Sequence, residues 1–104
     1  MESRITKLQE FLRQQPGDCF LRHALAMEYI GAGETEQARR LLEEVLADDP
    51  GYVASYYQLG KLYESAGEVD RALDIYEKGM QAAQSADDRR ARNELQSAYD
   101  ELAY

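Results

Sequence analysis

Two side chains of this sequence are spaced so that they could do covalent chemistry together. Cys19 and His23 are four residues apart and so share one face of a helix. Cys19 would lie near the helix N-terminus, where the pKa of a thiol can fall. No motif surrounds the pair, and no third group is in obvious reach to orient the histidine. The favoured interpretation of the pair is a small half-buried cysteine and a surface histidine without a catalytic role. A thiol-dependent activity at Cys19 is a remote alternative.

Metal binding and catalysis by paired carboxylates have less support in the sequence. One histidine and one cysteine fall short of the four ligands of a structural zinc site, so we expect no metal and no cofactor. The acidic pairs Asp48-Asp49 and Asp87-Asp88 lie at expected helix ends, where such pairs are usually solvated caps. These observations predict a protein that is not an enzyme.

The charge and the cysteine count limit the partners and the compartment. The net charge of −8 repels phosphate backbones and anionic lipid, so we expect neither nucleic acid nor membrane as a partner. A single cysteine cannot form an internal disulfide, and no apolar run has the length of a signal peptide or a membrane span. We therefore expect a cytoplasmic protein.

The elements that position these side chains follow from a self-match at a spacing of 34 residues. Residues 16–49 and 50–83 agree at nine positions. The match begins with Pro16-Gly17 against Pro50-Gly51, and the other repeated residues are Leu25, Tyr29, Ala32, Gly33, Glu34, Ala38 and Glu43 against Leu59, Tyr63, Ala66, Gly67, Glu68, Ala72 and Glu77. A period of this length is typical of a stacked repeat of two helices, which is built for surface and favours binding over catalysis.

Apolar spacing predicts six helices. Each repeat has two apolar stripes of helical period, separated by Gly31-Ala32-Gly33 or Ser65-Ala66-Gly67, and Asp18 is a plausible N-cap. The end segments carry one stripe each, and the last falls into register with the first helix of a repeat only if two extra residues are allowed near 84–88. We expect one all-α domain over 1–104, with a half-repeat helix at 1–16, repeats at 17–50 and 51–84, and a capping helix at 85–104.

These residues resemble the tetratricopeptide repeat. The second repeat carries that family's pattern at Tyr56, Leu59-Gly60, Tyr63, Ala72 and Tyr76. The first repeat departs from it at Arg22, where the pattern has an aromatic residue, and Gln84 replaces the final proline of the second, which suggests that its last helix is extended. The sequence is similar to small stand-alone bacterial members. The resemblance implies an α-α superhelix that acts as a non-catalytic protein-protein interaction module.

The same resemblance implies a concave groove lined by the first helix of each repeat. Its predicted partner-binding residues are Phe20, His23, Met27, Tyr57, Lys61, Arg90 and Asn93. Exposed apolar side chains beside Lys61 and Arg90 would suit a peptide with an apolar anchor and an acidic group. In the alternative interpretation, Phe20 and Met27 are partly buried against a neighbouring helix.

Two questions about partners stay open. Some family members grip the carboxylate of a chaperone tail, and the corresponding positions here are His23, Met27, Gln58, Arg90 and Glu94, which keep little of that clamp. A chaperone-tail adaptor is therefore not expected. The protein acts either as a monomer that binds another protein or peptide, or as a homodimer formed through the groove or an end helix.

Overall fold

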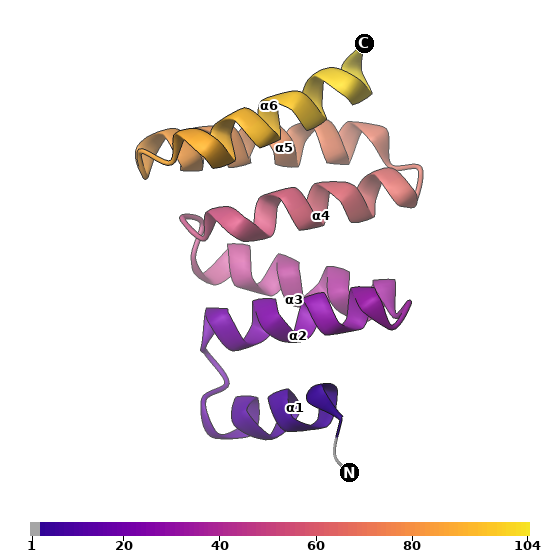
Figure 1. Cartoon of the computed structure of the whole chain (residues 1–104), viewed down its shortest axis with the longest axis vertical. Helices are drawn as coiled ribbons and strands as arrows, with labels where there is room; N and C mark the ends of the chain where they lie inside the picture. The colour runs from indigo at the N-terminus through magenta and orange to yellow at the C-terminus, as the bar shows by residue number, and fades with distance from the viewer. Residues whose placement is uncertain (1–2) are drawn as a thin grey trace. The chain divides into compact units, whose positions relative to one another are not determined.

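The computed structural model describes residues 3–104, and over that range it contains six α-helices and no strand (Figure 1). The helices are α1 (Arg4–Gln14), α2 (Cys19–Gly31), α3 (Thr35–Asp48), α4 (Val53–Ser65), α5 (Val69–Ser85) and α6 (Arg89–Ala103). The prediction of an all-α fold with six helices is confirmed. The chain forms two compact units, unit 1 (Met1–Asp49) and unit 2 (Pro50–Tyr104), and we describe each by itself.

Side-chain caps begin three of the helices. The predicted cap Asp18 accepts a hydrogen bond from the backbone N–H of Leu21 at 2.9 Å, and Asp88 accepts one from Ala91 at 3.0 Å. Ser3 does the same for Thr6 at 3.1 Å. These bonds satisfy backbone donors that the first turn of a helix leaves without a partner.

One type of turn ends α2, α4 and α5. Gly33 and Gly67 take φ angles of 79° and 77°, the left-handed region that glycine enters without strain. The N–H of the residue after each glycine then donates back to the last turn of the helix, to Tyr29 O at 2.8 Å and to Tyr63 O at 2.9 Å. After α5 the left-handed residue is Asp87, with φ 55°.

The position of that third turn accounts for the two extra residues that the register required. α2 and α4 begin 34 residues apart, at Cys19 and Val53, whereas α6 begins 36 residues after α4, at Arg89. Without a proline near its end, α5 continues for 17 residues to Ser85. The predicted extension of this helix is confirmed.

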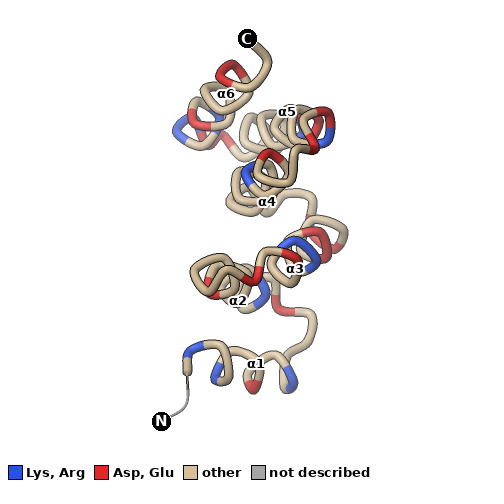
Figure 2. The backbone as a smooth tube through the Cα atoms, turned by 90° about the vertical axis from the view of Figure 1, so that its right-hand side faces the viewer, with Lys and Arg blue, Asp and Glu red and all other residues tan. Residues whose placement is uncertain are grey.

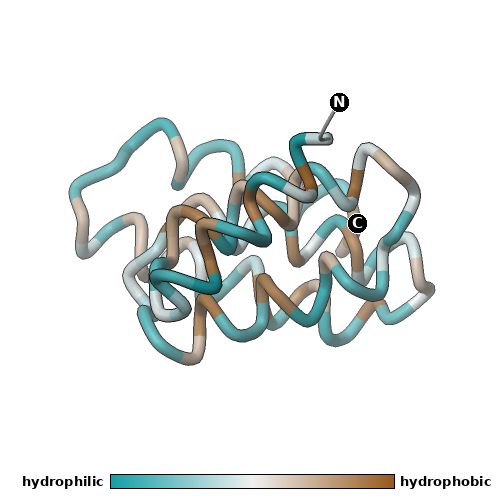
Figure 3. The backbone as a smooth tube through the Cα atoms, turned by 90° about the horizontal axis from the view of Figure 1, so that it is seen from below, coloured by the Kyte–Doolittle hydropathy of each residue, from teal (hydrophilic) through white to brown (hydrophobic). Residues whose placement is uncertain are grey.

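Small residues bring paired helices together within each unit. In unit 2 a Cβ atom added to Gly60 would overlap the ring of Tyr76, and one added to Gly79 would lie 2.6 Å from Cβ of Tyr56. In unit 1 the positions equivalent to Gly60 and Tyr76 hold Ala26 and Leu42, and both of these residues are fully buried. Hydrophobic and hydrophilic residues alternate along the helices that can be followed in Figure 3, as expected where only one side of a helix is packed.

In unit 1, α1 is attached to α2 by one buried apolar residue and two polar contacts. Leu8 is buried, Gln9 Nε2 donates to the hydroxyl of Tyr29 at 2.9 Å, and Arg4 lies 3.4 Å from Glu28. Among residues 3–104, no helix is both long enough and apolar enough to cross a lipid bilayer.

Candidate partner-binding surfaces

Three of the predicted residues form a stripe along α2. Phe20, His23 and Met27 are spaced by three and four residues and therefore lie on one side of the helix. Phe20 is 69% exposed and Met27 is 37% exposed. The alternative interpretation, in which a neighbouring helix partly buries both, is therefore wrong for Phe20 and holds only in part for Met27. We call these three residues the α2 stripe.

The α2 stripe carries no charge at neutral pH. His23 is half-buried, and burial lowers the pKa of its imidazole below the ordinary value of 6.5, because the charged form loses solvation. The neutral ring can then pack beside Phe20 and Met27 without an ionic cost. This arrangement suits an apolar group of a partner better than a charged one.

An ion pair that the sequence did not reveal supports the start of α2. Arg22 is only 7% exposed, and its guanidinium donates to Asp48 Oδ2 at 2.6 Å and to the carbonyl oxygen of Gly17 at 3.2 Å. The hydrogen bond that Arg22 donates to Asp48 raises the pKa of Arg22 above its usual value. Asp48 is an exposed residue at the end of α3, as expected, and its carboxylate also neutralises the buried guanidinium of Arg22.

Arg22 of this ion pair also contacts Cys19. This cysteine is half-buried, as the non-catalytic interpretation predicted, and its Sγ accepts a weak bond from Arg22 Nη2 at 3.6 Å. One signal could have indicated the pair: an arginine at the aromatic position of the repeat, followed by an aspartate at the end of the next helix. Over the described range, no group of three or more His, Cys, Asp or Glu residues could hold a metal ion.

In unit 2 the corresponding positions form a polar network. Lys61 Nζ lies 3.4 Å from Glu64 Oε2 and 5.5 Å from the ring centroid of Tyr57. Tyr76 donates a short hydrogen bond to the same carboxylate, and its ring centroid lies 6.4 Å from that of Tyr57. Burial and the bond to Glu64 together raise the pKa of Tyr76 far above its usual value. Lys61 therefore has its charge balanced within unit 2.

The last two predicted residues lie on α6 and are exposed. Arg90 Nε contacts Glu94 Oε1 at 3.2 Å, and Asn93 is one turn further along the helix. Arg90 and Glu94 also line a hollow of about 290 Å³ together with Val53 and Ala54 of α4. The structure thus brings Tyr57 and Lys61 into contact, and it places Arg90 against the start of α4.

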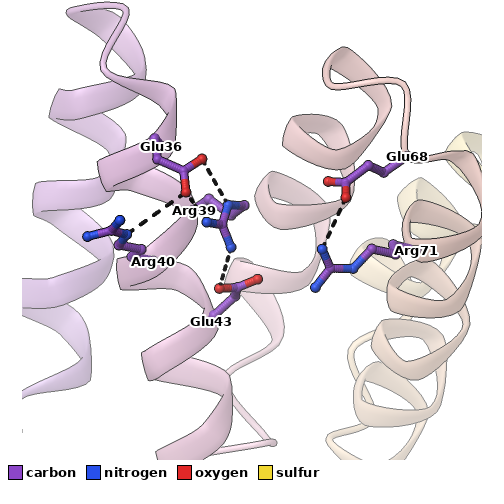
Figure 4. Close-up of polar contacts among 6 residues, drawn as sticks. All are labelled: Glu36, Arg39, Arg40, Glu43, Glu68 and Arg71. Atoms are coloured by element: carbon purple, nitrogen blue, oxygen red, sulfur yellow. Dashed lines mark hydrogen bonds and ion pairs between the residues drawn. The ribbon is translucent and has the colours of Figure 1, made fainter.

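The acidic residues of α3 and α5 are partly neutralised by arginines (Figure 4). On α3, Arg39 bonds to Glu36 and, at 2.8 Å, to Glu43, while Arg40 lies 3.9 Å from Glu36. On α5, Arg71 lies 3.1 Å from Glu68 and covers the ring of Tyr63 at 4.7 Å. The bond from Arg39 lowers the pKa of Glu36. Apart from the half-buried pair of Arg39 and Glu43, these ion pairs have at least one exposed partner, and exposed pairs contribute little to stability.

The family model described as tetratricopeptide repeat matches residues 29–99. The TPR repeat-containing protein PA0015 of Pseudomonas aeruginosa is 31% identical over 91 residues, which cover 88% of this chain and 87% of that protein.

Two solved structures share the fold. The tetratricopeptide repeat domain protein from Salinibacter ruber is 39% identical, covers 84% of this chain and 88% of its own, and has a TM-score of 0.80. The TPR2B domain of yeast Sti1, solved in complex with pHsp70, has a TM-score of 0.88 over 95% of this chain and 79% of its own. Because its identity is 14%, the second likeness concerns the fold alone.

Proposed function

Because the chain belongs to the tetratricopeptide-repeat family, whose members generally mediate protein-protein interaction, we propose that it holds an apolar segment of a partner protein on the α2 stripe. The observation that carries the proposal is the exposure of Phe20 and Met27 on a helix with a capped start and a well-defined end. Exposed aromatic and methionine side chains of this kind are common anchors in protein interfaces. The Sti1 domain, solved with pHsp70, supports the use of this fold to hold a protein segment.

The proposed contribution of unit 2 is polar. Its predicted contact residues are Tyr57, Lys61, Arg90 and Asn93. Lys61 is paired with Glu64 and Arg90 with Glu94, so an acidic group of the partner would have to displace a carboxylate already in place. We therefore propose that the apolar anchor at the α2 stripe supplies most of the affinity, and that unit 2 adds hydrogen bonds through Tyr57 and Asn93.

Quantitative affinity capture tests the proposal. Wild-type protein, the double variant Phe20→Ala/Met27→Ala and the control Val69→Ala would be immobilised and exposed to lysate of cells that make the protein. Val69 is a matched control because it is also an exposed apolar residue, but it lies on α5. Anchor residues each contribute more than about 1 kcal/mol, so we expect enrichment of the partner to fall at least about tenfold in the double variant. Undiminished capture by a folded double variant would refute the proposal.

A further inference from the structure

Met27 is the residue of the α2 stripe that an oxidant can convert into a polar one. Its thioether is the stripe's only sulfur group, since the other members are Phe20 and His23. Met27 is 37% exposed, whereas Met80, the other methionine that the structure describes, is half-buried on α5. The equivalent of Met27 in unit 2 is Lys61, so only unit 1 presents a thioether at this repeat position.

The space beside Met27 admits a small reagent. Met27 borders a hollow of about 370 Å³, which Ile5, Gly31 and Ala32 also line. Gly31 lies one turn further along α2, and a Cβ atom added to it would meet no side chain and no other helix within 4 Å. This end of the α2 stripe is therefore open, and a small oxidant can approach it.

The helix that carries Met27 has few charged residues (Figure 2). α2 contains two of them, Arg22 and Glu28. Arg22 is buried and paired with Asp48, and Glu28 lies 3.4 Å from Arg4, so both charges are balanced within unit 1. A polar atom added to Met27 would therefore change the character of a surface that is suited to an apolar group.

We propose that a hydroperoxide converts Met27 to its sulfoxide and that this oxidation switches off partner binding at the α2 stripe. The inference rests on the proposed function, because it concerns the regulation of the same surface. The thioether sulfur attacks the terminal oxygen of the hydroperoxide, a sulfur–oxygen bond forms, and the O–O bond breaks. The proton on the transferred oxygen passes to the departing oxygen, which leaves as an alcohol or water. The sulfur loses two electrons, and the hydroperoxide gains them.

The sulfoxide weakens binding because it places a strong hydrogen-bond acceptor where the partner buries an apolar group. An acceptor that is buried without a donor loses its hydration, which the thioether hardly has. Met27 lies on the surface of α2 and outside the core, so the change affects binding and leaves the fold intact. The oxidation is reversible, because methionine sulfoxide reductases return the thioether at the expense of two thiols, with a disulfide and water as products.

Treatment with hydrogen peroxide followed by affinity capture tests the switch. Every sample would carry Cys19→Ser, so that oxidation of the thiol contributes nothing, and the peroxide would be removed before lysate is added. We expect Met27 to gain one oxygen atom, as peptide mass spectrometry detects, and enrichment of the partner to fall at least about fivefold. Treatment with a methionine sulfoxide reductase and dithiothreitol should then restore capture.

Two leucine variants locate the effect, each compared with its own untreated sample. Met27→Leu has no sulfur, so peroxide should not change its capture of the partner. Met80→Leu is the matched control on α5 and should lose capture on treatment as the parent does.

Three results would overturn the switch: undiminished capture by the oxidised parent, an equal loss in Met27→Leu, or resistance in Met80→Leu. The untreated variant Phe20→Ala/Met27→Ala tests the proposed function separately, because no oxidation is involved. Undiminished capture by that variant would refute both proposals. Its loss of capture, beside an oxidised parent that still captures the partner, would refute the switch alone.

Discussion

The two repeats fill equivalent positions with residues of different size, and the differences compensate. Unit 1 has Ala26 in α2 and Leu42 in α3, whereas unit 2 has Gly60 in α4 and Tyr76 in α5. The first residue becomes smaller where the second becomes larger. At these two positions the summed side-chain volume is therefore nearly the same in both repeats, and only its division between the two helices differs.

A second pair of positions differs in polarity, and here the change in size at one position is not balanced by the change at the other. Arg22 and Val45 of unit 1 correspond to Tyr56 and Gly79 of unit 2. Arg22 donates to the carbonyl of Gly17, and the hydroxyl of Tyr56 donates to the carbonyl of Pro50 at 2.5 Å, so both side chains hold a Pro-Gly turn. Only the arginine needs an anion, and the partner is Asp48, whose place is taken by Ala82 in unit 2.

Of the changes that test this comparison between the repeats, removal of the Tyr76 side chain should have the largest effect on stability. We expect Tyr76→Ala to lower the free energy of unfolding by about 3 to 5 kcal/mol, because a fully buried aromatic ring is removed. The matched variant Leu42→Ala in unit 1 should cost about 1 kcal/mol less, since a smaller side chain without a hydroxyl is lost. Urea unfolding measures both, and a smaller loss for Tyr76→Ala than for Leu42→Ala would contradict the comparison.

Exchanging the pair tests the compensation directly. Gly60→Ala should destabilise unit 2 by about 1 to 3 kcal/mol through overlap with the Tyr76 ring, despite the better helix propensity of alanine. Tyr76→Leu should leave a cavity. The double variant reproduces Ala26 and Leu42, so its loss should be smaller than the sum of the single losses by at least about 1 kcal/mol. Additive losses would show that the two positions do not share one volume.

Removing the anion from unit 1 should have a moderate effect. We expect Asp48→Ala to cost about 1 to 2 kcal/mol, because Arg22 stays buried after losing its charged acceptor. Glu44→Ala is the control, since it removes the same charge from an exposed position on the same helix. Chemical unfolding of both variants in 0.5 M salt checks the origin of the loss, which salt should reduce only in part, because Arg22 is buried although Asp48 is exposed. Equal losses in the two variants would argue against the ion pair.

The smallest expected effect is a pH dependence specific to unit 1. Unfolded His23 takes up its proton near pH 6.5, whereas burial holds the pKa of the folded side chain lower. The corresponding stability is fully present above pH 6.5 and is lost as the pH falls through the lowered folded value. His23→Tyr gives position 23 the residue type that Tyr57 has in unit 2. This variant should lose the change of stability with pH between pH 7 and pH 5.5. Unfolding curves that keep the same slope in the variant would assign the effect to other groups.

Most of the fold could be predicted from the sequence, because the helices and turns depend on apolar spacing and glycines within short stretches of the chain. The spacing of Leu42 and Val45 predicted a helix with one buried face, and Gly33 predicted the turn that ends α2. The register shift near residues 84–88 indicated where the repeat departs from its period, and the turn at Asp87 lies there. Each of these signals depends on residues close in the chain.

The contacts of the surfaces were harder to predict. The ion pair of Arg22 and Asp48 joins residues 26 positions apart. In the sequence alone, Arg22 is a departure from the repeat pattern and Asp48 is an acidic residue at a helix end. The network around Glu64 was missed because a tyrosine from the next helix completes it. Both arrangements follow from the packing of two helices, so neither has a signature along one of them.

We propose that the partner binds at exposed positions of α2 that differ between the repeats, namely the α2 stripe. The most direct test transfers the residues of α4 to α2 in the variant Phe20→Ala/His23→Tyr/Met27→Lys, which installs the equivalents of Ala54, Tyr57 and Lys61. Titration calorimetry with the captured partner, alongside thermal unfolding, measures binding and fold together. We predict native-like unfolding with binding weakened at least about tenfold. Wild-type affinity in a folded variant would contradict the account.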